Sequence, residues 1–238
     1  MSFKIIVDSC CDLSPELLRS GIFHSVPLTI YVGENEFRDD DTLVPQTLVD
    51  AMAMCQEASH TACPSPADYL DAFEAVDGDI YVVTLSALLS GSHNSAWQAA
   101  QMFVEEHPER NIRVFNSCSA SSGETLIALK ISELASSGMP FAQVVAQVEK
   151  YITEMNTLFV LENLDMLRKA GRLTRVQSLV TGALRVKLVM GSTPQGEIKK
   201  HTQALSIKQA LNKLADIVAA DENHKGKLLC IAHCLCRE

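Results

Sequence analysis

The sequence predicts an α/β fold, because short apolar strand patterns alternate with helical patterns through most of the chain. Two loops of small residues, at 61–66 and 86–96, each lead into an amphipathic helix pattern. Residues 31–37 and 192–197 have the turn residues of hairpins. The hairpins indicate that the sheets are not wholly parallel.

The individual elements follow from local pattern. The strand candidates are short and apolar, and they are residues 3–7, 26–32, 80–85, 112–115, 157–161, 186–190 and 227–232. The helical candidates lie between them, at residues 14–20, 45–56, 67–75, 94–106, 123–136, 141–154, 164–169 and 207–219. Ser14 and Ser65 each precede a proline, as a capping hydroxyl precedes the first helical residue.

Composition is that of an ordinary soluble protein. The 238 residues are 47% hydrophobic and 21% charged, and no apolar run reaches the roughly 18 residues that span a bilayer. No signal-peptide pattern opens the chain, so we expect a cytoplasmic protein whose eight cysteines are reduced. The net charge of −9 argues against a nucleic-acid surface, because phosphates would be repelled.

The chain is long enough for one large or two modest domains. No low-complexity linker marks a boundary, and the best division falls where the helix pattern at 141–154 ends. We therefore expect an N-terminal domain at 1–156, which carries the two small-residue loops, and a C-terminal domain at 157–238.

The two loops together are typical of a receptor for one carboxylate. Ser90, Gly91 and Ser92 follow the strand pattern at 80–85 and precede a helix, where free backbone N–H groups and the helix dipole attract anions. The residues alone leave other readings open. Thr61 and Ser65 also suit a turn and a helix cap, the second loop suits a cap without a ligand, and both loops suit a phosphate or nucleotide.

Five motifs in order make the chain resemble a known family. They are IIVDSCCDLSPELL at the N-terminus, TACPSP, LSGSHNSA, VFNSCSASSGE and NLDMLRKAGRL. In this order they are similar to the DegV family of bacterial fatty-acid-binding proteins, which includes the binding subunits of fatty acid kinase. The resemblance implies two α/β domains with the ligand held at or near their interface, and a role in phospholipid metabolism.

The resemblance also implies roles for particular residues. Thr61 and Ser90 match the hydroxyls that the family uses to bind the fatty-acid carboxylate, and the Gly91 N–H is a third donor. We expect Ser92, Ser9 and Ser65 to line the same site. Family members usually run longer, and a His-containing, Gly-rich segment that contributes to the site in some of them is absent here, which implies either a truncated chain or a reduced site.

The same resemblance implies a partner and no catalysis. The segment NLDMLRKAGRL ends a short helix with a glycine and several cations, which by itself suits a helix C-terminus. In the family it suggests that Arg172 and Lys169 dock the catalytic subunit of a fatty acid kinase, which makes the acyl phosphate. We expect no cofactor, and the sequence has neither the GxxxxGK[ST] nor the GxGxxG pattern.

Two further readings compete with this one. An acyl or ester hydrolase would use Ser90 as nucleophile and His93 or His233 as base, although no GxSxG pattern is present and a surface position is the simpler reading of His93. Cys230, Cys234 and Cys236 with His233 are soft metal ligands. They lack a second well-spaced pair, so we expect no metal site.

Overall fold

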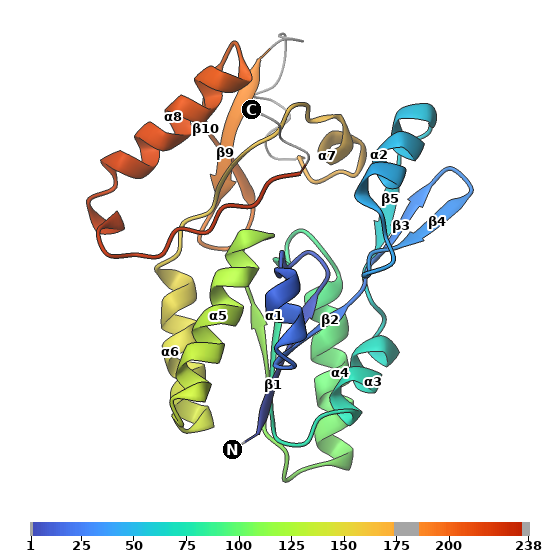
Figure 1. Cartoon of the computed structure of the whole chain (residues 1–238), viewed down its shortest axis with the longest axis vertical. Helices are drawn as coiled ribbons and strands as arrows, with labels where there is room; N and C mark the ends of the chain where they lie inside the picture. Colours follow the sequence, from blue (N-terminus) through green and yellow to red (C-terminus); the bar gives the residue numbers. More distant parts are fainter. Residues whose placement is uncertain (1, 174–185, 235–238) are drawn as a thin grey trace. The chain divides into compact units, whose positions relative to one another are not determined.

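The computed structural model describes residues 2–173 and 186–234. The chain divides into two compact units, the first spanning Met1–Met155 together with Cys230–Glu238 and the second spanning Asn156–Leu229. The separate folding of 1–156 and 157–238 as domains stays a prediction. Figure 1 labels helices and strands of both units.

A parallel sheet forms the centre of the first unit. Its order is β2-β1-β6-β7, and the strands are β1 (Phe3–Asp8), β2 (Phe23–Val26), β6 (Asp79–Thr84) and β7 (Ile112–Asn116). Every pair is parallel, with Ile5 of β1 opposite both Phe23 of β2 and Tyr81 of β6. The predicted α/β class is therefore confirmed.

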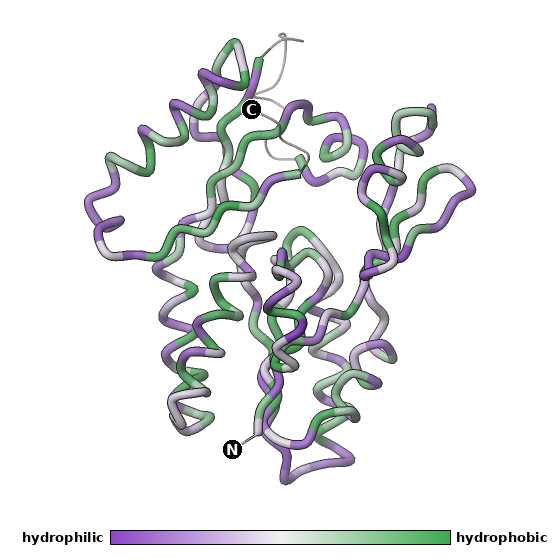
Figure 2. The backbone as a smooth tube through the Cα atoms, in the orientation of Figure 1, coloured by the Kyte–Doolittle hydropathy of each residue, from purple (hydrophilic) through white to green (hydrophobic). Residues whose placement is uncertain are grey.

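Helices cover both faces of this sheet, because alternate strand residues point to opposite sides. Ile5, Val7 and Val83 pack on one face with α5 (Ser122–Ser136) and α6 (Phe141–Thr153). Ile6 and Val82 pack on the other with α3 (Pro66–Glu74) and α4 (Ser92–Glu106). The helices alternate between hydrophobic and hydrophilic residues along their turns, as one-sided burial requires (Figure 2).

The strand expected at 26–32 is divided in two, because the chain changes sheets there. Pro27 has no N–H for a ladder, and it separates β2 from β3 (Thr29–Val32). β3 lies in a second, antiparallel sheet of order β4-β3-β5, with β4 (Asn35–Arg38) and β5 (His60–Ala62). The hairpin expected at 31–37 is confirmed, whereas β5 was missed.

Two further helices belong to the first unit. The short α1 (Pro15–Arg19) follows β1, and the Ser14 hydroxyl accepts the Leu17 N–H at 3.3 Å, as the predicted cap requires. The helix α2 (Pro45–Met54) starts at Pro45 and has no buried residue.

The second unit is an antiparallel sheet of order β10-β9-β8. Its elements are β8 (Leu158–Val160), α7 (Asp165–Lys169), β9 (Lys187–Ser192), β10 (Ile198–Ala204), α8 (Ile207–Ala220) and the 3₁₀ turn Glu222–His224. Val189 packs with α8 residues on one face, while Leu188 and Met190 pack with Leu173 on the other. The hairpin expected at 192–197 joins β9 to β10.

The strand expected at 227–232 is wrong. These residues have no regular secondary structure, and Leu228, Leu229 and Ile231 are exposed. Hydrophobicity suggested a buried strand, but a strand requires a neighbouring strand for its backbone hydrogen bonds. Within the described residues, no strand pairs with this segment.

Gly191 provides a test of the second unit. A Cβ at this position would lie 2.4 Å from the Thr157 carbonyl oxygen, which also accepts the Ser192 N–H at 3.2 Å. We expect Gly191→Ala to lower the free energy of unfolding by about 3 kcal/mol, the upper end of ordinary overpacking. Denaturant titration followed by circular dichroism measures the change.

Gly226→Ala is the matched control. The new Cβ there meets no atom within 4 Å, and only the φ of +76° opposes it. The expected loss is about 1 to 2 kcal/mol. Equal losses in the two variants would contradict the close approach of β9 to Thr157.

Candidate functional site

The candidate site lies where two central strands of the parallel sheet end. The chain leaves β1 toward β2 on one side, whereas β6 leads toward β7 on the other. The carboxyl ends of β1 and β6 therefore meet at a switch point of the strand order, which is where open α/β sheets bind ligands. The residues after these two strands are Ser9 and the loop 85–91.

The loop after β6 is a tight turn that continues directly into α4. The N–H groups of Leu89 and Ser90 both donate hydrogen bonds to the Ser86 carbonyl oxygen, with N···O distances of 2.9 and 3.1 Å. The Ser90 hydroxyl accepts the Ser92 N–H at 3.2 Å, and Gly91 is the N-cap of α4. The first turn of a 15-residue helix therefore opens at Ser90–Ser92 and brings the positive end of its dipole there.

Asp8 fixes both ends of this loop. Its Oδ2 accepts the Leu85 N–H at 2.9 Å and the Ser92 hydroxyl, and its Oδ1 accepts the Cys10 N–H at 3.1 Å. Ser92 is buried, and its hydroxyl also shares a hydrogen bond of 2.7 Å with the Tyr69 hydroxyl of α3. These contacts give Ser92 a role in holding the loop, and its contact with a ligand stays a prediction.

The second small-residue loop lies beside the first. Cys63 follows β5, and its Sγ lies 3.9 Å from the Ser95 Oγ of α4. A Cβ added at Gly91 would meet the same sulfur at 3.0 Å, so the backbone at Gly91 passes close to Cys63. Thr61 lies two residues before Cys63, in β5 rather than in a loop, and pairs with Ile30. The two loops predicted to act together are thus neighbours.

Two other expected site residues have structural partners. The Ser9 hydroxyl accepts the Leu28 N–H at 3.0 Å and donates to Asp39 at 2.8 Å, which ties the end of β1 to the second sheet. Ser65 caps α3 in a capping box with Asp68, as its proline context suggested. The binding roles of Ser9 and Ser65 stay predictions.

His93 does not have the surface position expected of it. The residue is partly buried, and its Nδ1 lies 3.2 Å from the Thr84 hydroxyl. Burial lowers the pKa of His93, and Arg113 lowers it further. The hydrogen-bond partner found for the imidazole is therefore the Thr84 hydroxyl.

Lys169 and Arg172 are exposed at the end of α7. Gly171 ends the helix with a φ of +74°, its N–H bonds to the Arg168 carbonyl oxygen at 3.1 Å, and the Arg172 N–H bonds to the Leu167 carbonyl oxygen at 2.9 Å. This pair of bonds is a Schellman ending, in agreement with the glycine signal. The motif leaves both cations at the surface of the second unit.

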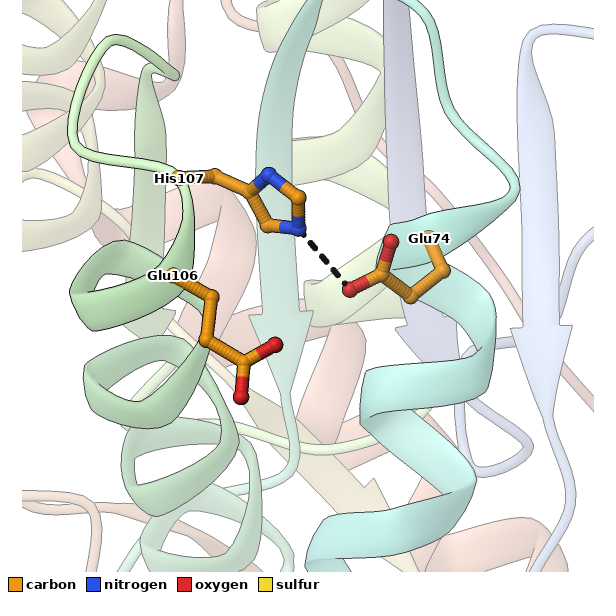
Figure 3. Close-up of side chains that lie close together, drawn as sticks. All are labelled: Glu74, Glu106 and His107. Carbon is orange, nitrogen blue, oxygen red and sulfur yellow. Dashed lines mark hydrogen bonds and ion pairs between the residues drawn. The ribbon is translucent and has the colours of Figure 1, made fainter.

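Three side chains at the C-terminal ends of α3 and α4 form a small polar group (Figure 3). Ligand atoms of Glu74, Glu106 and His107 lie within 4.8 Å of one another, and His107 Nε2 is 3.1 Å from Glu74. Both carboxylates are exposed. The group lies at the opposite end of α4 from Ser92, and exposed acidic groups of this kind commonly hold no ion.

The cysteines in the described part of the chain are free thiols. Burial raises the thiol pKa of Cys10 and of Cys11. Of the C-terminal group, Cys230 is partly buried and Cys234 is exposed, while Cys236 lies outside the described residues. Within those residues, no helix combines the length and hydrophobicity needed to cross a membrane.

The sequence did not predict that Tyr69 and Glu124 lie near the site. It also did not predict any hydrogen-bond partner for Asp8. The spacing of Ser121 and Glu124 is that of a capping box, and Glu124 does accept the Ser121 N–H at 3.2 Å. The spacing was a readable signal for the helix start. It gave no indication that Glu124 is buried beside Asp8, because that contact joins residues far apart in the sequence.

Comparison with known proteins gives a consistent result. The family described as "Uncharacterised protein, DegV family" matches residues 2–238. A DegV domain-containing protein of Streptococcus gordonii is 37% identical over 236 residues, which cover 98% of this chain and 83% of the relative.

Solved structures agree with the sequence comparison. A DegV-family protein from Ruminococcus gnavus, refined with vaccenic acid, is 49% identical with a TM-score of 0.89, over 93% of this chain and 79% of that one. The Streptococcus pneumoniae fatty acid kinase (Fak) B3 protein, loaded with linoleic acid, is 37% identical with a TM-score of 0.84, over 92% and 78% of the two chains. The chain belongs to the DegV family.

Proposed function

We propose that this protein binds a long-chain fatty acid and presents its carboxylate to the catalytic subunit of a fatty acid kinase. The observation that carries the proposal is the contact between the two small-residue loops at the switch point, where Cys63 lies against Gly91. Relatives 49% and 37% identical to the chain contain vaccenic and linoleic acid, which supports the choice of ligand.

The loops offer the donors that a buried carboxylate needs. A carboxylate without partners in an apolar site is prohibitively unstable, whereas each charge-assisted hydrogen bond contributes about 1.5 to 3 kcal/mol. In this proposal the Thr61 and Ser90 hydroxyls and the Gly91 N–H are the donors, aided by the positive end of the α4 dipole. Hydroxyls suit a carrier, because they hold the carboxylate without a strong ion pair.

The acyl chain would provide most of the affinity. Each buried methylene contributes about 0.8 kcal/mol, so some 14 of them give on the order of 11 kcal/mol before ordering costs. If ordering costs offset only part of this figure, the ligand would stay bound through purification.

The transfer chemistry would belong to the partner. The hydrogen bond found for His93 is with Thr84, which favours a carrier over a hydrolase that needs a base hydrogen-bonded to Ser90. We propose that the protein is a non-catalytic subunit that works in the cytoplasm without a cofactor, and that Lys169 and Arg172 contact the kinase. The kinship with the fatty acid kinase B3 protein of S. pneumoniae supports this partner.

Removal of the carboxylate donors tests the headgroup assignment. We expect Ser90→Ala and Thr61→Val each to weaken the binding of vaccenic acid about tenfold to a hundredfold, because each removes one charge-assisted hydrogen bond. Displacement of a fluorescent fatty acid measures the affinity, and circular dichroism checks the fold.

Thr153→Val is the matched control, because it removes an exposed hydroxyl that donates to the Lys150 carbonyl oxygen at the end of α6. It should bind as the wild type does. Unchanged affinity in both loop variants would disprove the headgroup assignment. Hydrolysis of a chromogenic ester by the wild type, lost in Ser90→Ala, would show that the protein is a hydrolase and not a carrier.

The docking proposal has a separate test. Replacement of both Lys169 and Arg172 by alanine should raise the protein concentration that half-saturates a fatty acid kinase about tenfold, since two exposed charges together contribute roughly 1.4 kcal/mol. Acyl phosphate formation from linoleic acid and ATP measures the effect, while fatty-acid affinity should not change.

Lys225→Ala provides the control, because Lys225 is an exposed cation of the same unit. It should leave the half-saturating concentration as in the wild type. An equal effect in the control and in the double variant would show that net charge, and not these two residues, sets the half-saturating concentration. No effect in either variant would show that Lys169 and Arg172 do not contact the kinase.

A further inference from the structure

Two carboxyl groups are buried side by side under the loop after β6. Asp8 ends β1 and Glu124 lies in the first turn of α5, and both are 0% exposed. The two carboxyl groups lie close enough that each alters the pKa of the other. Two ionised carboxylates offer only acceptors, so a hydrogen bond between them requires a proton on one of them.

The hydrogen-bond partners indicate which group carries the proton. Asp8 accepts three protein donors, namely the N–H groups of Cys10 and Leu85 and the Ser92 hydroxyl. Glu124 accepts the Ser121 N–H on Oε1, but among the described residues no donor reaches its Oε2. A carboxylate is stabilised at Asp8, whereas an ionised Glu124 would leave a buried oxygen unpaired.

The neighbouring groups favour the same assignment. Burial raises the pKa of Glu124 well above its ordinary value, and the charges of Asp8 and Asp12 raise it further. Burial also raises the pKa of Asp8, although its hydrogen bonds oppose that change. The Cys10 and Cys11 thiols and the Tyr69 phenol have pKa values raised by burial, so these neighbours are neutral.

We propose that Glu124 keeps its proton at neutral pH and donates it to Asp8, and that this one-proton pair positions the Ser90–Ser92 loop for its carboxylate ligand. The pair acts through Asp8, which binds the loop at Leu85 and at Ser92. Glu124 is therefore a positioning residue. The inference rests on the proposed function in one respect, the nature of the ligand.

A proton on Glu124 limits the negative charge beneath the ligand-binding loop. The ligand is itself an anion, and it would bind above a buried Asp8 that already carries one negative charge. Ionisation of Glu124 would add a second charge, repel Asp8, and weaken the contacts that hold Leu85 and Ser92. A carboxyl that stays neutral completes the hydrogen-bond network without that repulsion.

The pair makes stability depend on pH in a defined direction. The folded chain retains the Glu124 proton, whereas the unfolded chain releases it near the ordinary pKa of glutamate. The stabilisation that comes from the Glu124 proton is therefore fully present below the pKa of glutamate in the unfolded chain. It falls as the pH rises toward the raised pKa of Glu124 in the folded chain. Glu124→Gln has no proton to lose there. The unfolding equilibrium constant of the wild type should rise about tenfold per pH unit relative to Glu124→Gln in this window.

Infrared spectroscopy of the intact protein tests the proton directly. At neutral pH the wild type should show the absorption of a protonated carboxyl group, shifted by ¹³C-glutamate but not by ¹³C-aspartate labelling. The band should persist in Glu133→Gln, which removes an exposed carboxylate of the same helix, and vanish in Glu124→Gln. Absence of the band in the wild type, or a shift with labelled aspartate, would overturn the proposal without use of any variant.

Binding of vaccenic acid tests the positioning role. Glu124→Ala should bind about tenfold more weakly than the wild type, and Glu124→Gln should restore affinity, because an amide N–H can replace the carboxyl O–H toward Asp8. Equal binding by the wild type and Glu124→Ala would contradict the positioning role. The infrared band needs no ligand, so a wild type that shows the band but binds no fatty acid would refute the proposed function and leave the proton assignment standing.

Discussion

The adjacency of β1 and β6 in the parallel sheet is the constraint on which the rest of the site depends. These strands are far apart in the sequence, yet Ile5 pairs with Tyr81 and Val7 with Val83. Their pairing brings the carboxyl end of β1 beside the loop that opens α4. Asp8 then reaches the backbone of Leu85 and the hydroxyl of Ser92, and the turn between them is held at both ends.

The cost of this arrangement is a buried negative charge. A carboxylate away from water is stable only with several donors, and Asp8 receives them from three elements around the strand end. Glu124 lies beside this carboxylate and stabilises it only when Glu124 is itself protonated. The same burial that fixes the loop also makes its geometry sensitive to one proton, so structure and electrostatics cannot be separated at this site.

Local pattern was sufficient for much of the fold. Apolar periodicity placed most strands and helices, and the serines before Pro15 and Pro66 marked two helix starts. Local pattern failed where strand pairing between distant segments determines the structure. Hydrophobicity alone did not show that Pro27 separates two sheets or that 227–232 has no pairing strand, and the three-residue β5 is too short to have a period.

The site was predicted in part for the same reason. Motifs located the two loops, and their contact through Cys63 and Gly91 agrees with a joint role. The burial of Asp8 and Glu124 against one another depends on strand order and on where α5 begins, neither of which a local pattern contains. Serine hydroxyls that seemed equivalent in the sequence have different partners, since Ser92 bonds to Asp8 and Ser65 caps α3.

The central claim is that this chain carries a fatty acid at the paired loops. Mass spectrometry of the organic extract from freshly purified protein tests it most directly, with Ser90→Ala processed in parallel. The account predicts close to one long-chain fatty acid for each wild-type molecule and a reduced amount in the variant. An empty wild-type extract, together with no uptake of added vaccenic or linoleic acid, would contradict it.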